Sequence, residues 1–224
     1  DVGVLTRNKQ ATEHLARHAG ARAMAAQQAL GLLPIMLASG APVSKSDLRV
    51  EAYGGVDEAN ACLGLARLHT AGDADLDAAL ARIQNELFDL GADLATPAEP
   101  DEAPGSRLRI LDSQVARLEA EIDAMNDALP PLASFVLPAE TPAAAALRLG
   151  QAHGLPLGAA ALHLARTVAR RAEREAVRLA EAGEPVSEPA LKYLNRLSDF
   201  LFVAARWAND RGASEVFWKA GATR

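Results

Sequence analysis

The chain has one cysteine, Cys62, among its 224 residues, and only 4% of its residues are aromatic. A lone cysteine excludes a disulfide framework within the chain and a thiolate zinc site. It also favours a reducing compartment, so we expect a cytoplasmic protein. The longest apolar candidate, residues 29–38, contains Pro34 and falls well short of the roughly 20 residues that span a bilayer. No membrane-spanning segment is therefore expected.

Basic charge is also scarce, because 23 Lys and Arg stand against 29 Asp and Glu, for a net charge of −6. That balance argues against nucleic acid or an anionic membrane surface as the main partner. Half of the residues are hydrophobic, and about fifty of all residues are alanine. Alanine is the strongest helix former, whereas aromatic residues favour strands. The composition therefore predicts an all-α protein with one domain or at most two.

Apolar side chains recur at three- and four-residue steps in several stretches, which is the pattern of one helix face. A weak helix is expected over about residues 11–30, and five substantial helices over about residues 57–69, 76–96, 108–129, 158–182 and 188–209, with a further short piece at 143–150. Residues 135–138 are expected to form a short apolar loop or an extended segment. Five substantial helices joined by short loops predict an up-and-down helical bundle.

Residues 1–43 form a segment of different character, in which basic residues precede the apolar stretch 30–37 and few acidic residues accompany them. This pattern is typical of a targeting segment, either a signal peptide or an Arg-rich transit peptide. The alternative is an amphipathic or poorly ordered N-terminal segment. We expect the helical bundle to occupy residues 44–212 and a C-terminal tail to occupy residues 213–224.

The densest charge cluster contains Arg166, Arg170 and Arg174, which lie four residues apart and therefore share one face of a helix. Guanidinium groups match phosphate oxygens bidentately, so the cluster favours binding of a polyphosphate. The alternative is a solvated face whose charge is balanced by Glu173 and Glu175.

Two further polar clusters admit a structural or a functional interpretation. Asn195 lies one turn from Asp199, either on the polar side of an amphipathic helix or facing the bundle interior to bind a ligand. Asp57 follows a glycine pair and fits the acidic first turn of a helix, which the helix dipole favours. If Asp57 were buried it would need a partner, and Arg166 is a good candidate.

Five stretches together resemble the PduO-type ATP:cob(I)alamin adenosyltransferases. They fall in the family's order and cover residues 43–64, 83–92, 135–138, 165–174 and 193–202. The resemblance implies a five-helix bundle that assembles as a homotrimer and binds ATP and a corrinoid between neighbouring subunits. It implies transfer of the 5′-deoxyadenosyl group of ATP to the cobalt of reduced cob(I)alamin, with release of triphosphate. Mg²⁺ is expected with the triphosphate, and a reductase is a further expected partner.

The resemblance also assigns roles to single residues, none of them as a protein ligand of a metal. The implied ATP-binding residues are Lys45, Arg170, Arg171, Glu173, Arg174 and Asn195. Asp57 and Arg166 match a salt bridge across the subunit interface. Phe135 matches an aromatic residue beneath the corrin that keeps the lower axial position free of ligand. The implied catalytic residues are Arg170, Glu173 and Phe135.

The chain departs from the family pattern in two places. The glycine-rich loop that wraps the triphosphate is not recognisable, although residues 5–7 match its first residues. After Pro138 the usual Gly-Gly is replaced by Ala139-Glu140, and the stretch up to residue 157 contains an inserted piece. These departures leave an alternative to an active enzyme, namely an impaired relative that binds a corrinoid or a nucleotide as a carrier or sensor. A helical scaffold without either ligand is the third hypothesis.

Overall fold

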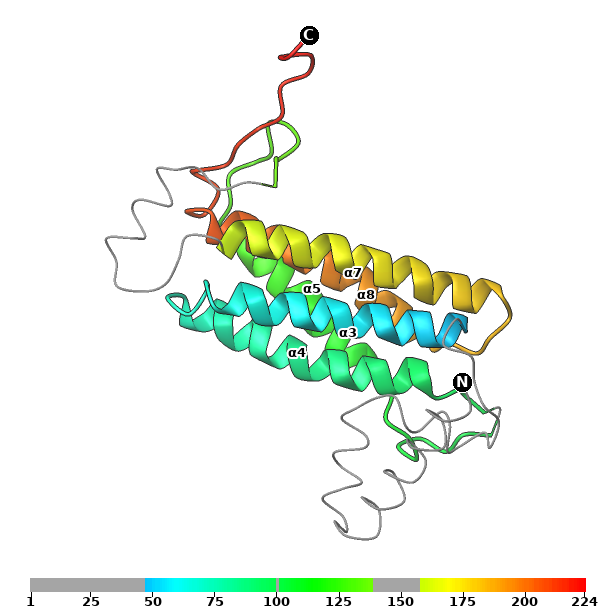
Figure 1. Cartoon of the computed structure of the whole chain (residues 1–224). Coiled ribbons are helices and arrows are strands. Elements are labelled where there is room, and N and C mark those ends of the chain that lie inside the picture. Colours follow the sequence, from blue (N-terminus) through cyan, green and yellow to red (C-terminus); the bar gives the residue numbers. More distant parts are fainter. Residues whose placement is uncertain (1–46, 100, 139–157) are drawn as a thin grey trace, which may run out of the picture. The chain divides into compact units, whose positions relative to one another are not determined.

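The computed structural model describes residues 47–99, 101–138 and 158–224, and all of them belong to one compact unit that spans Lys45–Arg224. Its helices are α3 (Leu48–Arg67), α4 (Ala74–Ala95), α5 (Asp112–Asp127), α7 (Gly158–Glu181) and α8 (Glu188–Ala208), shown in Figure 1. The prediction of an all-α fold with five packed helices is confirmed. The expected helices at 11–30 and 143–150, the targeting segment, Lys45 and the insertion after Pro138 lie outside the described residues.

The helices run in alternating directions along the chain. Arg49, at the start of α3, donates to the Leu94 carbonyl at the end of α4 over 2.7 Å and to Glu184, just after α7, over 2.8 Å. The Asp93 carboxylate, also near the end of α4, accepts from the Ile110 amide before α5 and from the Ser187 hydroxyl before α8. The starts of α3, α5 and α8 therefore lie at the same end as the C-termini of α4 and α7.

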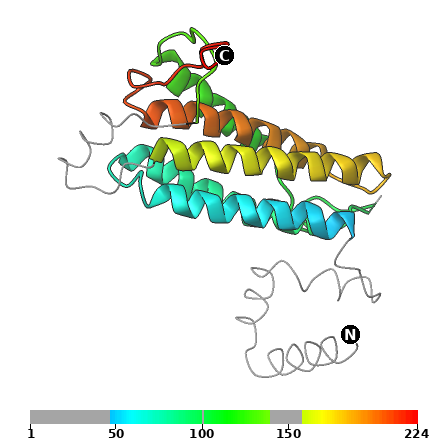
Figure 2. The ribbon, with the colours of Figure 1, turned by 45° about the horizontal axis from the view of Figure 1, so that its top comes forward.

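Helices that pack against each other in this bundle are not always consecutive in the chain. Helix α3 packs on α4 and α7, while α8 packs on α7, α5 and α4. Figure 2 shows α7 (yellow) between α3 (cyan) and α8 (orange). Helix α8 is accordingly the most enclosed helix, and its buried side chains include Tyr193, Leu197, Phe200 and Leu201. No described helix combines the length and apolar character needed to cross a membrane.

Helix α3 begins earlier than the sequence predicted. Its N-cap is Asp47, whose carboxylate accepts from the Arg49 amide over 2.9 Å, so the expected start near Asp57 is wrong. The Gly54-Gly55 pair suggested a helix start but lies inside the helix. A Cβ added to Gly55 would lie 3.2 Å from the Ala172 Cα on α7, so this glycine allows the two helices to approach closely.

Polar residues within the core fix how the helices sit on one another. The Tyr193 hydroxyl of α8 donates to the buried Glu86 carboxylate of α4 over 2.7 Å. Burial, reinforced by the negative charge of Glu86, raises the pKa of Tyr193, which keeps the hydroxyl protonated as a donor. Arg82 of α4 adds a bidentate ion pair to Glu121 of α5. Glu86, within residues 83–92, and the neighbouring Arg82 thus help to hold the helices together.

Two segments pair beyond the ends of the helices. The Trp218 amide donates to the Phe135 carbonyl over 2.8 Å, and the Leu137 amide donates to the Val216 carbonyl over 2.8 Å. A single antiparallel bridge joins Val136 to Phe217. We call residues 134–138 and 214–218 the aromatic ribbon. Part of the expected C-terminal tail is therefore held in extended pairing with the segment that contains Phe135.

Candidate functional site

Helix α7 presents one apolar and one cationic face. Its apolar face packs on α3 and α8 through small residues and leucines, including Leu162, Ala165, Ala169, Ala172 and Ala176. Because alanine is small, the neighbouring helices approach closely along this face. The charged residues that the sequence places between the alanines are left on the outside of the bundle.

An open groove of about 630 Å³ follows the outer face of α7. The described residues that line it are Arg170, Glu173, Arg174, Val177 and Arg178. Their three- and four-residue spacing places them along one helix face, as the sequence pattern predicted for Arg170 and Arg174. We call this feature the arginine groove. Val177 and Arg178 were missed by the sequence analysis, although Arg178 continues the four-residue spacing.

The cations of the arginine groove form no ion pair with any carboxylate in the described part of the chain. The Arg174 guanidinium donates instead to the Arg170 carbonyl over 3.0 Å, and that of Arg178 donates to the Arg174 carbonyl over 3.4 Å. The solvated-face interpretation required Glu173 and Glu175 to balance these charges. Glu173 accepts a hydrogen bond from Asn195, and Glu175 lies 3.9 Å from Arg171, so Glu175 offsets the charge of Arg178 only at longer range. The groove is therefore a row of cations suited to an anion.

Asn195 brings the second predicted cluster to the same place. Its side-chain amide donates to Glu173 over 2.8 Å, which joins α8 to α7 beside the groove. Arg196 donates to the side-chain Oδ1 of Asn195 and lies 3.2 Å from Asp199. Asn195 is exposed and does not face the bundle interior. Of the two interpretations from sequence, the surface position is correct, and the contact to Glu173 gives Asn195 a fixed orientation there.

Arg171 has surroundings that differ from those of its neighbours. It forms an ion pair with Glu58 of α3, and Glu175 lies one turn further along α7. The Glu58 carboxylate raises the pKa of Arg171. Burial raises the pKa of the Glu175 carboxyl, against the opposing effect of Arg171. Arg171 therefore faces α3 and does not line the groove.

Arg166 lies two turns before Arg174 in a more enclosed place. Its Nε is buried without a hydrogen-bond partner in the described residues, and its guanidinium carbon lies 5.8 Å from the centre of the Phe202 ring. Burial, together with the nearby positive charge of Arg170, lowers the pKa of Arg166. Asp57 is exposed on α3 and makes no ion pair with Arg166 within this chain. The salt bridge across a subunit interface stays a prediction.

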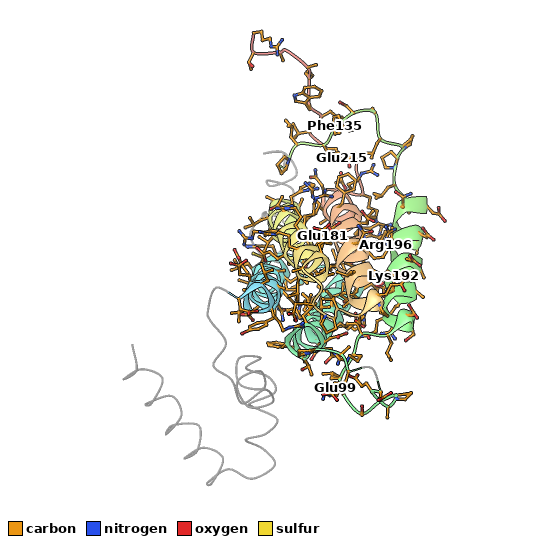
Figure 3. The ribbon with its side chains drawn as sticks, turned by 90° about the vertical axis from the view of Figure 1, so that its right-hand side faces the viewer. Glu99, Phe135, Glu181, Lys192, Arg196 and Glu215 are labelled. Atoms are coloured by element: carbon orange, nitrogen blue, oxygen red, sulfur yellow. The ribbon has the colours of Figure 1, made fainter. Side chains whose placement is uncertain are left out.

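Phe135 lies on the aromatic ribbon, above the bundle in the end-on view of Figure 3. Its side chain is 77% exposed, although it is a large apolar group, and its ring meets the Trp218 ring edge-on at 6.0 Å between centroids. Two aromatic rings held out from the core form an apolar surface that is available to a flat apolar ligand. Trp218 was missed from sequence because its pairing with residues 134–138 depends on the fold.

A protein-built metal centre is not found in the described residues, where no group of three or more His, Cys, Asp or Glu side chains gathers. Glu173 is the one carboxylate among the described residues of the arginine groove. Mg²⁺ is commonly held by one or two carboxylates together with substrate phosphates. The arrangement therefore fits a magnesium ion that enters with a polyphosphate.

Comparisons with known proteins agree on one family. The family model described as cobalamin adenosyltransferase matches residues 36–153 and 152–208. A corrinoid adenosyltransferase from Mycobacterium tuberculosis (strain ATCC 25618 / H37Rv) is 46% identical over 185 residues, which are 81% of this chain and 86% of that protein. One from Bacillus subtilis (strain 168) is 40% identical over 187 residues, 82% of this chain and 86% of that protein.

Solved structures of the same kind superimpose on this chain. A variant of the PduO-type ATP:corrinoid adenosyltransferase from Lactobacillus reuteri, complexed with cobalamin and ATP, matches with a TM-score of 0.64 and 36% identity, over 79% of this chain and 89% of that one. An arginine-to-lysine variant of the Lactobacillus reuteri enzyme, complexed with ATP, matches with a TM-score of 0.63 and 34% identity, over 79% and 90% of the two chains.

Proposed function

The chain belongs to the cobalamin adenosyltransferase family, and we propose that its arginine groove binds the triphosphate of ATP during adenosylation of a corrinoid. In this reaction the electron pair of Co(I) forms a bond to C5′ of ATP. The bond between C5′ and the triphosphate oxygen breaks, and its electrons leave with the triphosphate. The products are adenosylcobalamin, with cobalt formally Co(III), and free triphosphate.

The observation that carries this assignment is the row of unpaired cations on α7. When the C5′–O bond breaks, the α-phosphate oxygen keeps the bonding electrons, so the triphosphate gains one negative charge as it leaves. Arg170 and Arg174 line the groove without carboxylate partners among the described residues, so their donors are available to phosphate oxygens. Cations held in place before the reaction stabilise the developing charge with little reorganisation.

The remaining assigned residues support this groove. Glu173 is oriented by Asn195, and we propose that the pair holds ATP in register with the arginines. Lys45 is proposed as a further phosphate ligand. Phe135 is proposed to lie beneath the corrin, where an apolar ring cannot coordinate cobalt and leaves its lower axial position free. Without that ligand Co(II) is easier to reduce to the nucleophilic Co(I) state.

Three further assignments belong to the proposal. Mg²⁺ is proposed to accompany the triphosphate and to neutralise part of its charge, with Glu173 beside it. The assembly is proposed to be a homotrimer with sites between subunits. A reductase is proposed to supply the electron that converts the corrinoid to its Co(I) state.

An anaerobic assay tests the function directly. Chemically reduced cob(I)alamin, Mg²⁺ and ATP are mixed with the chain, and the absorbance change that accompanies formation of the cobalt–carbon bond is followed. We expect turnover by the unmodified chain, and a loss of roughly tenfold or more in kcat/KM for ATP in Arg170→Ala, because a charge-assisted hydrogen bond to phosphate is lost.

Arg117→Ala is the matched control. Arg117 is a half-exposed arginine on α5, where it lies 3.4 Å from Glu86, and it is not part of the groove. Its replacement should leave kcat/KM for ATP within about twofold. No turnover by a folded chain at millimolar ATP would contradict the transferase assignment. Calorimetric binding of ATP or cobalamin would then favour the impaired relative, and absence of binding would favour the scaffold.

A further inference from the structure

A buried ion pair lies between the helical bundle and the aromatic ribbon. The side chains of Arg206, near the end of α8, and Glu215, on the ribbon, are 2% and 0% exposed. The Arg206 Nε donates to Glu215, and its Nη2 donates to the Pro130 carbonyl over 2.6 Å. One guanidinium thus contacts both chain segments that lead into the ribbon.

Apart from two hydrogen bonds between Asn209 and Ser214 at its base, the aromatic ribbon has few contacts to fix it. It contains one antiparallel bridge, and two-stranded pairings of this size are at best marginally stable alone. Its outer side chains are exposed, Phe135 at 77% and Trp218 at 48%, so they add little burial. Figure 3, which views the helices end-on, shows Phe135 and Glu215 above the bundle. Contacts at the base of the ribbon must therefore set where Phe135 lies.

The turn after α8 is built to bring Glu215 back to Arg206. Asp210, Arg211 and Gly212 have positive φ values of 56°, 50° and 81°, a run of left-handed residues that reverses the chain. A Cβ on Gly212 would lie 2.9 Å from the Pro130 Cδ, so this position also lacks room for a side chain. Non-glycine residues with positive φ are uncommon and costly. The chain tolerates this conformation where it places a carboxylate against a buried guanidinium.

We propose that Arg206 and Glu215 are positioning residues, which hold the aromatic ribbon so that Phe135 presents its ring to the lower face of the corrin. This inference rests on the proposed function, because it gives Phe135 its role. The pair itself touches neither ATP nor the corrinoid. Its effect is on geometry, since a shift of the ribbon moves Phe135 and Trp218 together and opens the lower axial position to a ligand.

Glu215→Gln tests the positioning role of the ion pair between Arg206 and Glu215, because it removes the charge of Glu215 while keeping the shape and an acceptor oxygen. We expect the KM for cob(I)alamin to rise roughly tenfold while the KM for ATP stays within about twofold. We also expect a smaller fraction of bound cob(II)alamin without a lower axial ligand, measured from its absorption and electron paramagnetic resonance spectra. Arg206→Lys, which keeps the charge but loses the forked geometry, should give an intermediate value of both readouts.

Asp77→Asn is the matched control, because Asp77 also accepts a bidentate pair, from Arg67, but does not contact the ribbon. It should leave both readouts unchanged.

If Glu215→Gln does not fold, Gly212→Ala tests the same contact by changing the turn. It should likewise raise the KM for cob(I)alamin and leave the KM for ATP unchanged. Equal KM values for cob(I)alamin in the variants and in the active unmodified chain would overturn the positioning role of Arg206 and Glu215 alone. Inactivity of the unmodified chain would instead contradict the proposed function.

Discussion

Single cations on α7 differ in whether a carboxylate neutralises them. Arg171 meets Glu58 on α3, whereas Arg170 and Arg174 have no such partner in the described residues. The four-residue spacing predicted correctly that Arg170 and Arg174 share a face, since that follows from helix geometry alone. The pairing of Arg171 depends on which helix packs beside α7, and the spacing within α7 carries no information about that. The ATP-binding role that the family resemblance implies for Arg171 therefore has less structural support than that of its neighbours.

His163 is a second residue whose surroundings could not be read from sequence. It is 3% exposed on α7, its Nδ1 has no hydrogen-bond partner in the described residues, and its ring lies 6.3 Å from that of Phe202 on α8. Burial, together with the positive charge of Arg166, lowers the pKa of His163 from 6.5 to about 4. The imidazole is therefore neutral in the folded chain at neutral pH.

The lowered pKa predicts a dependence of stability on pH. Between about pH 6.5 and pH 4 the unfolded chain binds a proton at His163 that the folded chain does not, so stability falls as the pH falls. The full effect is on the order of 3 kcal/mol at 1.36 kcal/mol per pKa unit. His163→Leu should remove this part of the slope, measured as the free energy of unfolding in urea at several pH values. An unchanged slope would contradict the assignment to His163.

At the scale of helices, periodicity located most elements well. Helix α4 follows its leucine stripe, and α8 ends within a residue of its expected end. The start of α3 was missed because glycine is read as a helix breaker when considered alone. Gly55 is favoured instead by the closeness of Ala172 on α7, a tertiary constraint. The pairing of residues 134–138 with 214–218 was missed for a similar reason, since it depends on Arg206 and on the left-handed turn.

The glycine pair of α3 gives two substitutions with opposite expected effects. A Cβ at Gly54 meets no atom within 4 Å, so Gly54→Ala should raise the free energy of unfolding by about 0.5–1 kcal/mol through helix propensity. At Gly55 the larger Gly55→Val should overpack the contact with α7 and lower it by about 1–3 kcal/mol. Chemical denaturation followed by circular dichroism measures both values. Stabilisation by Gly55→Val would show that the helices separate at little cost.

At the scale of the whole molecule, the proposed trimer provides partners for charged groups that have none among the described residues of one chain. The buried Nε of Arg166 has no hydrogen-bond partner in the described residues, and its cation contacts the Phe202 ring. Arg166 is partly buried, and leaving a desolvated cation without its partner is unfavourable. Asp57 is exposed and forms no ion pair with the described residues. A second copy that presents Asp57 to Arg166 satisfies both groups, as the family resemblance implies.

Charge reversal tests this contact between copies. Asp57→Arg should shift the chain from trimer towards monomer, because it sets two cations against each other at each interface. Adding Arg166→Asp to the same chain reverses the pair and should restore part of the trimer. Sedimentation equilibrium measures the mass of each variant, with circular dichroism to confirm that the helices are formed. A trimer that is equally stable in Asp57→Arg would place the partner of Arg166 elsewhere. A single variant that dissociates and a double variant that reassembles would instead support Asp57 and Arg166 as neighbours across the interface.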